Sequence, residues 1–136
     1  MTVSELARRA KVTAGAVRHY TRIGLLAPVR DENNNYNYYS SDDLVRLSFI
    51  RKARLLGFSL KDIGDILEES SRSHSTCPLV RKIMAQRLRE NRDKLADLEK
   101  LQANMEHAAA RWVNMPDGMP DGNAVCHLIE TIAMKD

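Results

Sequence analysis

The sequence predicts a mainly α-helical protein in which a small N-terminal domain precedes one long helix. Three observations predict this fold. Gly24 and Gly57 each follow a segment with helical apolar spacing, where glycine commonly ends a helix. A tyrosine- and asparagine-rich stretch between them has the composition of a short β-hairpin. No glycine or proline occurs from Leu79 to Met115, which favours a single long helix.

The first two helices are expected to form a helix-turn-helix pair. Residues 3–10 form the first helix, which we expect Ser4 to cap, and residues 11–12 form the turn. Thr13 is placed to cap a second helix that runs to about Ile23. Serine and threonine suit these positions because their hydroxyl oxygens accept hydrogen bonds from the free N–H groups of a first helical turn.

A small wing is expected next. Residues 26–29 and 36–39 are the predicted strands, and the polar residues 31–35 form the turn between them. Ser41 should then cap a third helix over residues 42–55, and Ser59 a fourth. The apolar positions of these two helices recur at helical spacing and should form the core: Leu44, Leu47, Ile50, Leu55, Leu60, Ile63, Ile66 and Leu67.

The long helix should begin near Cys77, with Pro78 at its first helical position. Apolar residues then recur at heptad spacing: Leu88, Leu95, Leu98, Met105, Ala109 and Trp112. Asn91 and Gln102 interrupt the same seam. Because a seam of this length cannot be hidden in so small a monomer, we expect it to pair with a second copy of the chain. Packing of the helix within one chain is the alternative.

The C-terminal segment contains a duplicated turn sequence and a second cysteine. Residues 115–123 read M-P-D-G-M-P-D-G-N, whose two prolines and two glycines favour a loop. Residues 124–134 are expected to form a short closing helix that contains Cys126 and His127.

Charge is distributed unevenly between the two halves of the chain. Residues 1–58 contain ten Lys/Arg against five Asp/Glu, a balance of +5, and residues 59–136 contain eleven against thirteen, a balance of −2, which together give the net +3. The basic half is the half with the helix-turn-helix pattern, where a DNA-binding surface is expected.

The composition also excludes several classes of protein. No apolar run approaches the length of a membrane span and no signal peptide is evident, so we expect a soluble, cytoplasmic protein with no membrane partner. Two cysteines do not suggest a disulfide framework. We expect no enzyme, because the chain contains neither a P-loop nor a dinucleotide fingerprint, nor an oxyanion-hole glycine pattern.

Three stretches in the first seventy residues carry a family resemblance: V-R-H-Y-T-R-I-G-L-L, Y-N-Y-Y-S-S-D-D-L-V-R-L-S-F-I and L-G-F-S-L-K-D-I. In combination they resemble the MerR family of bacterial transcription regulators. The resemblance implies a homodimer with a winged helix-turn-helix DNA-binding domain (residues 1–70), a connector (71–77), a long antiparallel dimerisation coiled-coil helix (78–113) and an effector-binding loop and closing helix (114–136). It also implies that the dimer distorts double-stranded promoter DNA and works with RNA polymerase, repressing or activating the promoter according to the effector.

The residues expected to contact DNA share donor groups or positive charge and lie on the second helix, the wing and the third helix. They are Thr13, Arg18, His19, Tyr20, Arg22, Tyr36, Tyr38 and Lys52, with Arg51 and Arg54 as further candidates for phosphate contacts. In the resembling family an arginine usually follows the first tyrosine of the wing, whereas this chain has Asn37 there.

The effector is predicted from Cys77 and Cys126, which a helix of about 35 residues would hold roughly 50 Å apart in one chain. In an antiparallel dimer, one protomer's Cys77 would lie beside its partner's Cys126. The resemblance points to a thiophilic divalent metal ion: zinc, cadmium, lead or mercury. Metal-sensing members usually have a further cysteine where this chain has Trp112 and Val113, so a third ligand must come from elsewhere. His127 is the first choice, and the further candidates are His74, Asp117, Asp121, Met115 and Met119. The alternatives are redox or electrophile sensing by the same thiols, and an organic effector or none.

Overall fold

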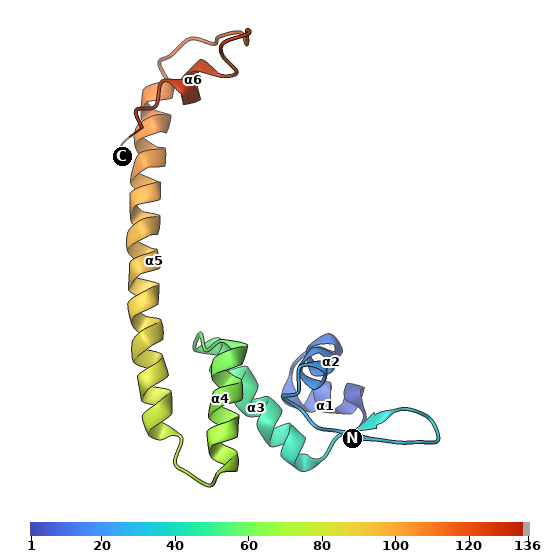
Figure 1. The fold of residues 1–136 in the computed structure, drawn as a ribbon. Helices are drawn as coiled ribbons and strands as arrows, with labels where there is room; N and C mark the ends of the chain where they lie inside the picture. Colours follow the sequence, from blue (N-terminus) through green and yellow to red (C-terminus); the bar gives the residue numbers. More distant parts are fainter. Residues whose placement is uncertain (135–136) are drawn as a thin grey trace. The chain divides into compact units, whose positions relative to one another are not determined.

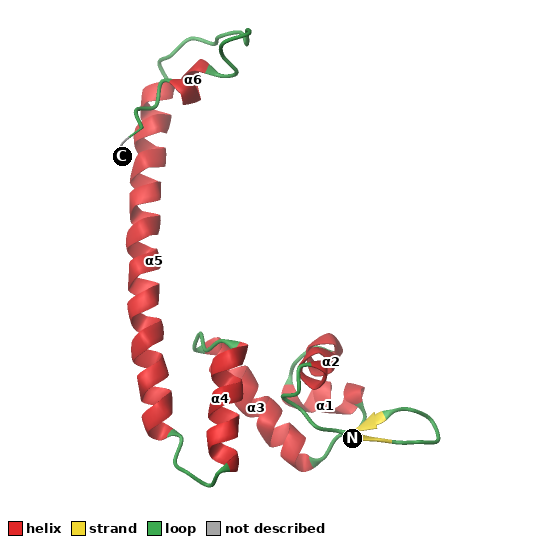
Figure 2. Cartoon of the chain, viewed as in Figure 1, coloured by secondary structure: helices red, strands yellow, loops and turns green. Residues whose placement is uncertain are grey.

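The computed structural model describes residues 1–134 and is mainly α-helical, as the sequence predicts (Figures 1 and 2). Its elements follow the order α1, α2, β1, β2, α3, α4, α5 and α6. The chain forms two compact units, Met1–Arg87 and the part that begins at Leu88. The second unit starts inside the long helix α5 (Cys77–Trp112).

Helices α1 (Val3–Ala10) and α2 (Ala14–Arg22) pack together as the helix-turn-helix pair. The Thr13 hydroxyl accepts a hydrogen bond from the Ala16 N–H at 3.0 Å, which confirms the predicted cap. The cap expected from Ser4 is wrong. Thr2 caps α1 instead, because its extended backbone lets the hydroxyl accept from the Glu5 N–H at 3.2 Å, whereas Ser4 lies within the helix.

The wing is a two-stranded antiparallel sheet of β1 (Val29–Arg30) and β2 (Asn37–Tyr38). The strands are shorter than predicted, and the first begins later. Leu26, predicted to start the first strand, is instead buried in the core. The turn is closed by Asp31, whose N–H donates to the Tyr36 carbonyl at 2.9 Å and whose carboxylate accepts from the Asn33 N–H at 2.8 Å.

Helices α3 (Ser41–Leu55) and α4 (Leu60–Ser71) both begin with a capping box. Ser59 caps α4 as predicted, but Ser40 caps α3 in place of Ser41. The reason is the position of Asp43 at the third helical residue, from which its carboxylate reaches back to the Ser40 N–H at 3.0 Å. Leu55, predicted to be buried, is 77% exposed.

Side chains from α1 to α4, from the loops between them and from the start of α5 enclose the core of the first unit. The fully buried members are Leu6, Val17, Leu47, Ile50 and Ile63, and Ile83 of α5 joins them. Gly24 and Gly57 follow α2 and α3 with φ of +86° and +89°, in the left-handed region that glycine adopts without strain. These turns let the next segment fold back onto the core.

A partly buried ion pair attaches the start of α5 to α4. Arg87 donates from Nε to Asp62 Oδ2 at 2.9 Å and from Nη2 to Oδ1 at 3.0 Å. Asp62 also accepts the Ser59 N–H at 3.0 Å. The Arg87 hydrogen bonds, supported by those from Ser59, outweigh the opposing effect of burial and lower the pKa of Asp62 to about 2. The pair therefore fixes α5 while the carboxylate stays ionised.

The segment after α5 is less helical than predicted. Only His127–Glu130 form a helix, α6, in place of the expected residues 124–134. Cys126 has an extended backbone, and the Glu130 carboxylate accepts the N–H groups of Val125 and Cys126, so the helix begins at His127, three residues later than predicted. The Trp112 indole donates to the Leu128 carbonyl at 3.0 Å and attaches α6 to the end of α5 (Figure 1).

Candidate DNA interface and effector site

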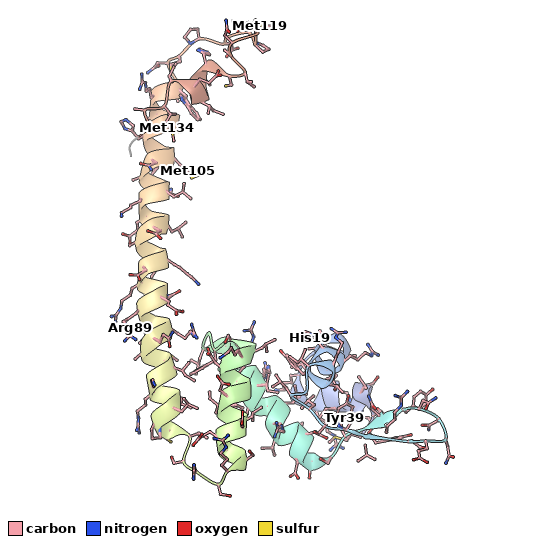
Figure 3. All side chains as sticks on the ribbon, in the orientation of Figure 1. His19, Tyr39, Arg89, Met105, Met119 and Met134 are labelled. Atoms are coloured by element: carbon pink, nitrogen blue, oxygen red, sulfur yellow. The ribbon has the colours of Figure 1, made fainter. Side chains whose placement is uncertain are left out.

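The outer face of α2 carries the donors expected to contact DNA. Val17 is fully buried on the opposite face, which directs Arg18 and Arg22 outward. His19, labelled in Figure 3, lies beside Arg22, whose Nη2 donates to the His19 Nδ1 at 2.9 Å. Because a guanidinium can only donate, this bond leaves the proton of a neutral His19 on Nε2. The face is therefore rich in donors, which suits phosphate oxygens and the acceptor edges of guanine.

The tyrosines divide into structural and exposed groups. The Tyr39 hydroxyl lies 2.7 Å from the Thr21 hydroxyl and its ring is buried, so Tyr39 holds the wing to α2. Tyr20 is half-buried against the core. Tyr36 and Tyr38 are exposed at the wing, where the Tyr38 hydroxyl accepts from the Asn34 amide at 3.3 Å. Tyr36 and Tyr38 are thus the tyrosines available to a DNA backbone.

The cations of α3 also divide by their partners. Lys52 is exposed and lines a shallow groove on α3 with Phe49 and neighbouring residues. The Arg54 guanidinium instead donates to the Phe58 carbonyl at 3.0 Å, and Arg46 donates to the Leu25 carbonyl at 2.9 Å. Arg46 and Arg54 therefore attach α3 to the loops beside it, a role that the sequence reasoning missed. For Arg54, the signal in the sequence was its position four residues before Phe58, across the turn at Gly57, which places the guanidinium near the Phe58 carbonyl.

The two cysteines are both free thiols. Cys77 is the exposed first residue of α5, and Cys126 is the partly buried residue before α6. Within residues 1–134, no group of three or more His, Cys, Asp and Glu side chains is arranged to hold a metal ion. One chain alone therefore does not provide a complete coordination shell in the part that the structure describes.

His127 provides the clearest sign of an unfilled bonding position near Cys126. Its Nε2 is buried and has no hydrogen-bond partner. Buried polar atoms are nearly always paired, so an orphaned imidazole nitrogen calls for an explanation such as a ligand. Imidazole and thiolate are both ligands of zinc and of softer ions. The donor types present thus fit a thiophilic divalent ion, provided that a further thiolate comes from another chain.

No helix in residues 1–134 is both long enough and apolar enough to cross a membrane.

The winged helix-turn-helix and the long helix with its apolar seam define a DNA-binding transcription regulator. More closely, the chain belongs to the MerR family: the model described as "MerR HTH family regulatory protein" matches residues 1–70, and the model described as "MerR, DNA binding" matches residues 44–108.

Relatives and solved structures agree with this assignment. The chain is 30% identical over 131 residues to the HTH-type transcriptional regulator ZntR of Escherichia coli K12, covering 96% of this chain and 90% of the relative. It is 29% identical over 136 residues to heavy metal-dependent transcription regulator 2 of Rhizobium meliloti, covering 98% and 86%. The crystal structure of the transcription regulator PbrR691 of Ralstonia metallidurans CH34 in complex with lead(II) superposes with a TM-score of 0.76 at 26% identity, covering 98% and 99%. The predicted family, the fold class and the expectation of a regulator, not an enzyme, are confirmed.

Proposed function

We propose that this MerR-type regulator is a homodimer that senses a thiophilic divalent metal ion and controls a promoter by distorting its DNA. The observation that carries the proposal is one free cysteine at the start of α5 and another beyond its end, with an exposed apolar seam between them. The similarity to a heavy metal-dependent transcription regulator and to a regulator crystallised with lead(II) supports the choice of a metal as effector.

Dimerisation is the first step of the proposal. The seam residues Leu88, Leu95, Leu98 and Met105 are all 46–60% exposed in the single chain (Met105 is labelled in Figure 3). Apolar side chains in a heptad seam are stabilised when a second helix covers them. An antiparallel partner helix would cover the seam and would bring the Cys77 end of one helix to the Cys126 end of the other.

The shared site would then be assembled from both protomers. Cys77 of one protomer and Cys126 of its partner would provide two thiolates, and His127 would provide an imidazole beside Cys126. A bound ion would supply positive charge and a bridge between the two protomers. Zinc, cadmium, lead and mercury all bind thiolate ligands.

DNA binding is assigned to the donor-rich face of α2 and to the wing. Thr13, Arg18 and Arg22 would contact phosphates or base edges, with His19 between the arginines and Tyr20 supporting them. Tyr36, Tyr38 and Lys52 would contact the flanking backbone. Metal binding would favour one of two DNA-bound conformations, and the resulting DNA distortion would set how RNA polymerase engages the promoter.

Metal titration of purified, reduced protein tests the sensing step. We expect two zinc or cadmium ions per dimer, with proton release from the thiols and loss of binding in both Cys77→Ser and Cys126→Ser. His127→Gln should weaken metal binding. His107→Gln is the matched control, because His107 is an exposed histidine on α5 and its replacement should leave metal binding unchanged. Wild-type binding in either cysteine variant would rule out the shared site.

Redox sensing is the second candidate, because the same pairing would bring two free thiols together. In that case an oxidant would join Cys77 of one protomer to Cys126 of its partner in a disulfide, and metals would not change promoter activity. Non-reducing electrophoresis of the oxidised protein, with each serine variant as control, separates the two candidates.

A further inference from the structure

The two Met-Pro-Asp-Gly repeats have the same four residues but different surroundings. A Cβ added at Gly118, in the first repeat, would lie 2.8 Å from the His127 Cδ2 and 3.1 Å from its Nε2. A Cβ added at Gly122, in the second repeat, would meet no atom within 4 Å. Neither glycine has a left-handed backbone, so the requirement at Gly118 is one of space and not of backbone conformation.

Gly118 is therefore one of the groups that cover the His127 ring. The imidazole Nε2 is buried without a hydrogen-bond partner, on the side where the Gly118 backbone lies. His127 is the first residue of α6, and the Trp112 indole attaches this helix to α5 through the Leu128 carbonyl. The contact between Gly118 and the His127 ring therefore leaves the His127 Nε2, which can still form a bond, facing the apolar Cα of Gly118.

The second repeat has a different role, since it makes a closed turn. The Asp121 carboxylate accepts the N–H groups of Asn123 at 2.7 Å and of Ala124 at 2.9 Å, and the Asp121 N–H donates to the Ala124 carbonyl at 2.9 Å. This turn fixes the end of the loop beside Cys126. The first repeat ends at Gly118, outside this turn, and Met119 lies at the tip of the loop (Figure 3).

We propose that the first repeat is a cover that occludes the His127 nitrogen in the metal-free protein and is displaced when a thiophilic divalent cation binds it. The inference rests on the proposed function and adds a regulatory step to the same site. A metal ion must approach an imidazole nitrogen to about 2 Å, which the covering backbone prevents. The apparent affinity for the ion is therefore reduced by the fraction of molecules in which His127 is covered.

Gly118→Ala and Gly122→Ala form a matched pair that tests the cover. The methyl group at residue 118 cannot coexist with the ring in its present place, so it destabilises the covered state, while the same change at residue 122 meets open space. We expect Gly118→Ala to bind zinc more tightly, on the order of tenfold in competition with a chelator, and Gly122→Ala to match the wild type. In a His127→Gln background the advantage of Gly118→Ala should vanish. Equal affinities for the two alanine variants, or weaker binding by Gly118→Ala, would overturn the proposal.

A metal-independent measurement separates this inference from the sensing proposal. Diethyl pyrocarbonate acylates accessible imidazoles, and peptide mass spectrometry reads each histidine separately. In wild-type protein without metal, we expect His127 to react several-fold more slowly than exposed His107, and Gly118→Ala to remove that protection. The chain contains one tryptophan, so Trp112 emission should shift in Gly118→Ala alone. If His127 reacts as fast as His107 in the wild type, the first repeat does not cover His127. If His127 is protected as expected but zinc does not bind, the metal-sensing proposal fails, while the occlusion of His127 by the first repeat is retained.

Discussion

The two compact units of this chain differ in how they bury their apolar side chains. Residues 1–87 enclose a core with five fully buried apolar side chains from α1 to α4. From Leu88 to the end of the described chain, Ala108 is the one buried residue, and the leucines of the α5 seam are exposed. Buried apolar surface is the main stabilising contribution to folding. The first unit therefore has its own source of stability, whereas the second requires another surface.

This difference separates two kinds of stability in one protein. The geometry of the α2 face and of the wing depends on contacts within one chain, so it should not vary with protein concentration. In the proposed dimer, the packing of α5 beyond Arg87 and the sharing of two cysteines would depend on association, so both should vary with protein concentration. Three changes test this division, in order of expected effect.

The largest effect is expected from two carboxylates in the seam. Leu95→Asp with Leu98→Asp should convert the dimer to monomers, because each added charge would have to be buried without a partner. Two linked half-site contacts then become one, so the affinity for a two-half-site operator should fall by about 100-fold or more. Sedimentation velocity and a mobility-shift titration measure the two effects.

Lys100→Asp is the matched control for the seam variant. It lies outside the apolar seam in the heptad repeat and changes the net charge by the same two units, so dimerisation and operator binding should be retained. Circular dichroism of the seam variant should still show a folded N-terminal unit. If the seam variant stayed dimeric, the dimer would have to form through another surface.

The contrast between the units also explains what the sequence could predict. Helices α1 to α4 were predicted closely because capping residues, glycine turns and apolar periodicity are local signals that agree with the final core. The errors at Ser4 and Ser41 arose where two nearby residues could each cap the helix, and the hydrogen bonds of Thr2 and Ser40 decided between them. Leu55 has helical spacing but lies at the end of α3, where it stays exposed. Residues 124–134 were predicted as helix from their composition, but the Glu130 side chain and the Trp112 indole set the start of α6, and such contacts have no periodic signal.

The candidate sites follow the same pattern. The donor face of α2 could be predicted because it is one helix with one buried side, on which Val17 lies. The roles of Arg46 and Arg54 could not, since each depends on a carbonyl in a neighbouring loop. Contacts between Gly118 and His127 are also absent from any sequence pattern, because loop residues nine positions apart have no fixed spatial relation.

An intermediate effect is expected from Asp62→Asn, which removes the charge that Arg87 pairs with inside the first unit. The loss of a buried charged hydrogen bond should lower the free energy of unfolding by about 1–3 kcal/mol. Asp65→Asn is the matched control, because Asp65 pairs with an exposed lysine, Lys61, at 3.4 Å and such pairs contribute little. Denaturant titrations at two protein concentrations should give the same difference, since the pair lies within one chain.

Lowering the pH should remove the difference in unfolding free energy between wild type and Asp62→Asn over a defined pH range. The pKa of Asp62 is lowered from 3.8 to about 2, so the folded state favours the ionised carboxylate. Its contribution is complete above pH 3.8 and is lost as the pH falls through about 2. The stabilities of wild type and Asp62→Asn should therefore converge between those values. A constant gap down to pH 2 would show that the variant acts through packing instead of charge.

The smallest effect is expected from Arg18→Ala, which changes the DNA face of the first unit and leaves the seam intact. If Arg18 contacts phosphate, specific and nonspecific DNA should both be bound more weakly by a similar factor, and the slope of log affinity against log salt should fall by about 1. Arg72→Ala is the control, because Arg72 pairs with Glu68 at 2.9 Å at the end of α4, away from α2. Loss of sequence discrimination at unchanged overall affinity would instead place Arg18 on a base edge. Arg18→Ala should remain a dimer with either outcome. Sedimentation velocity of this variant therefore distinguishes a loss of DNA contact from a loss of dimerisation.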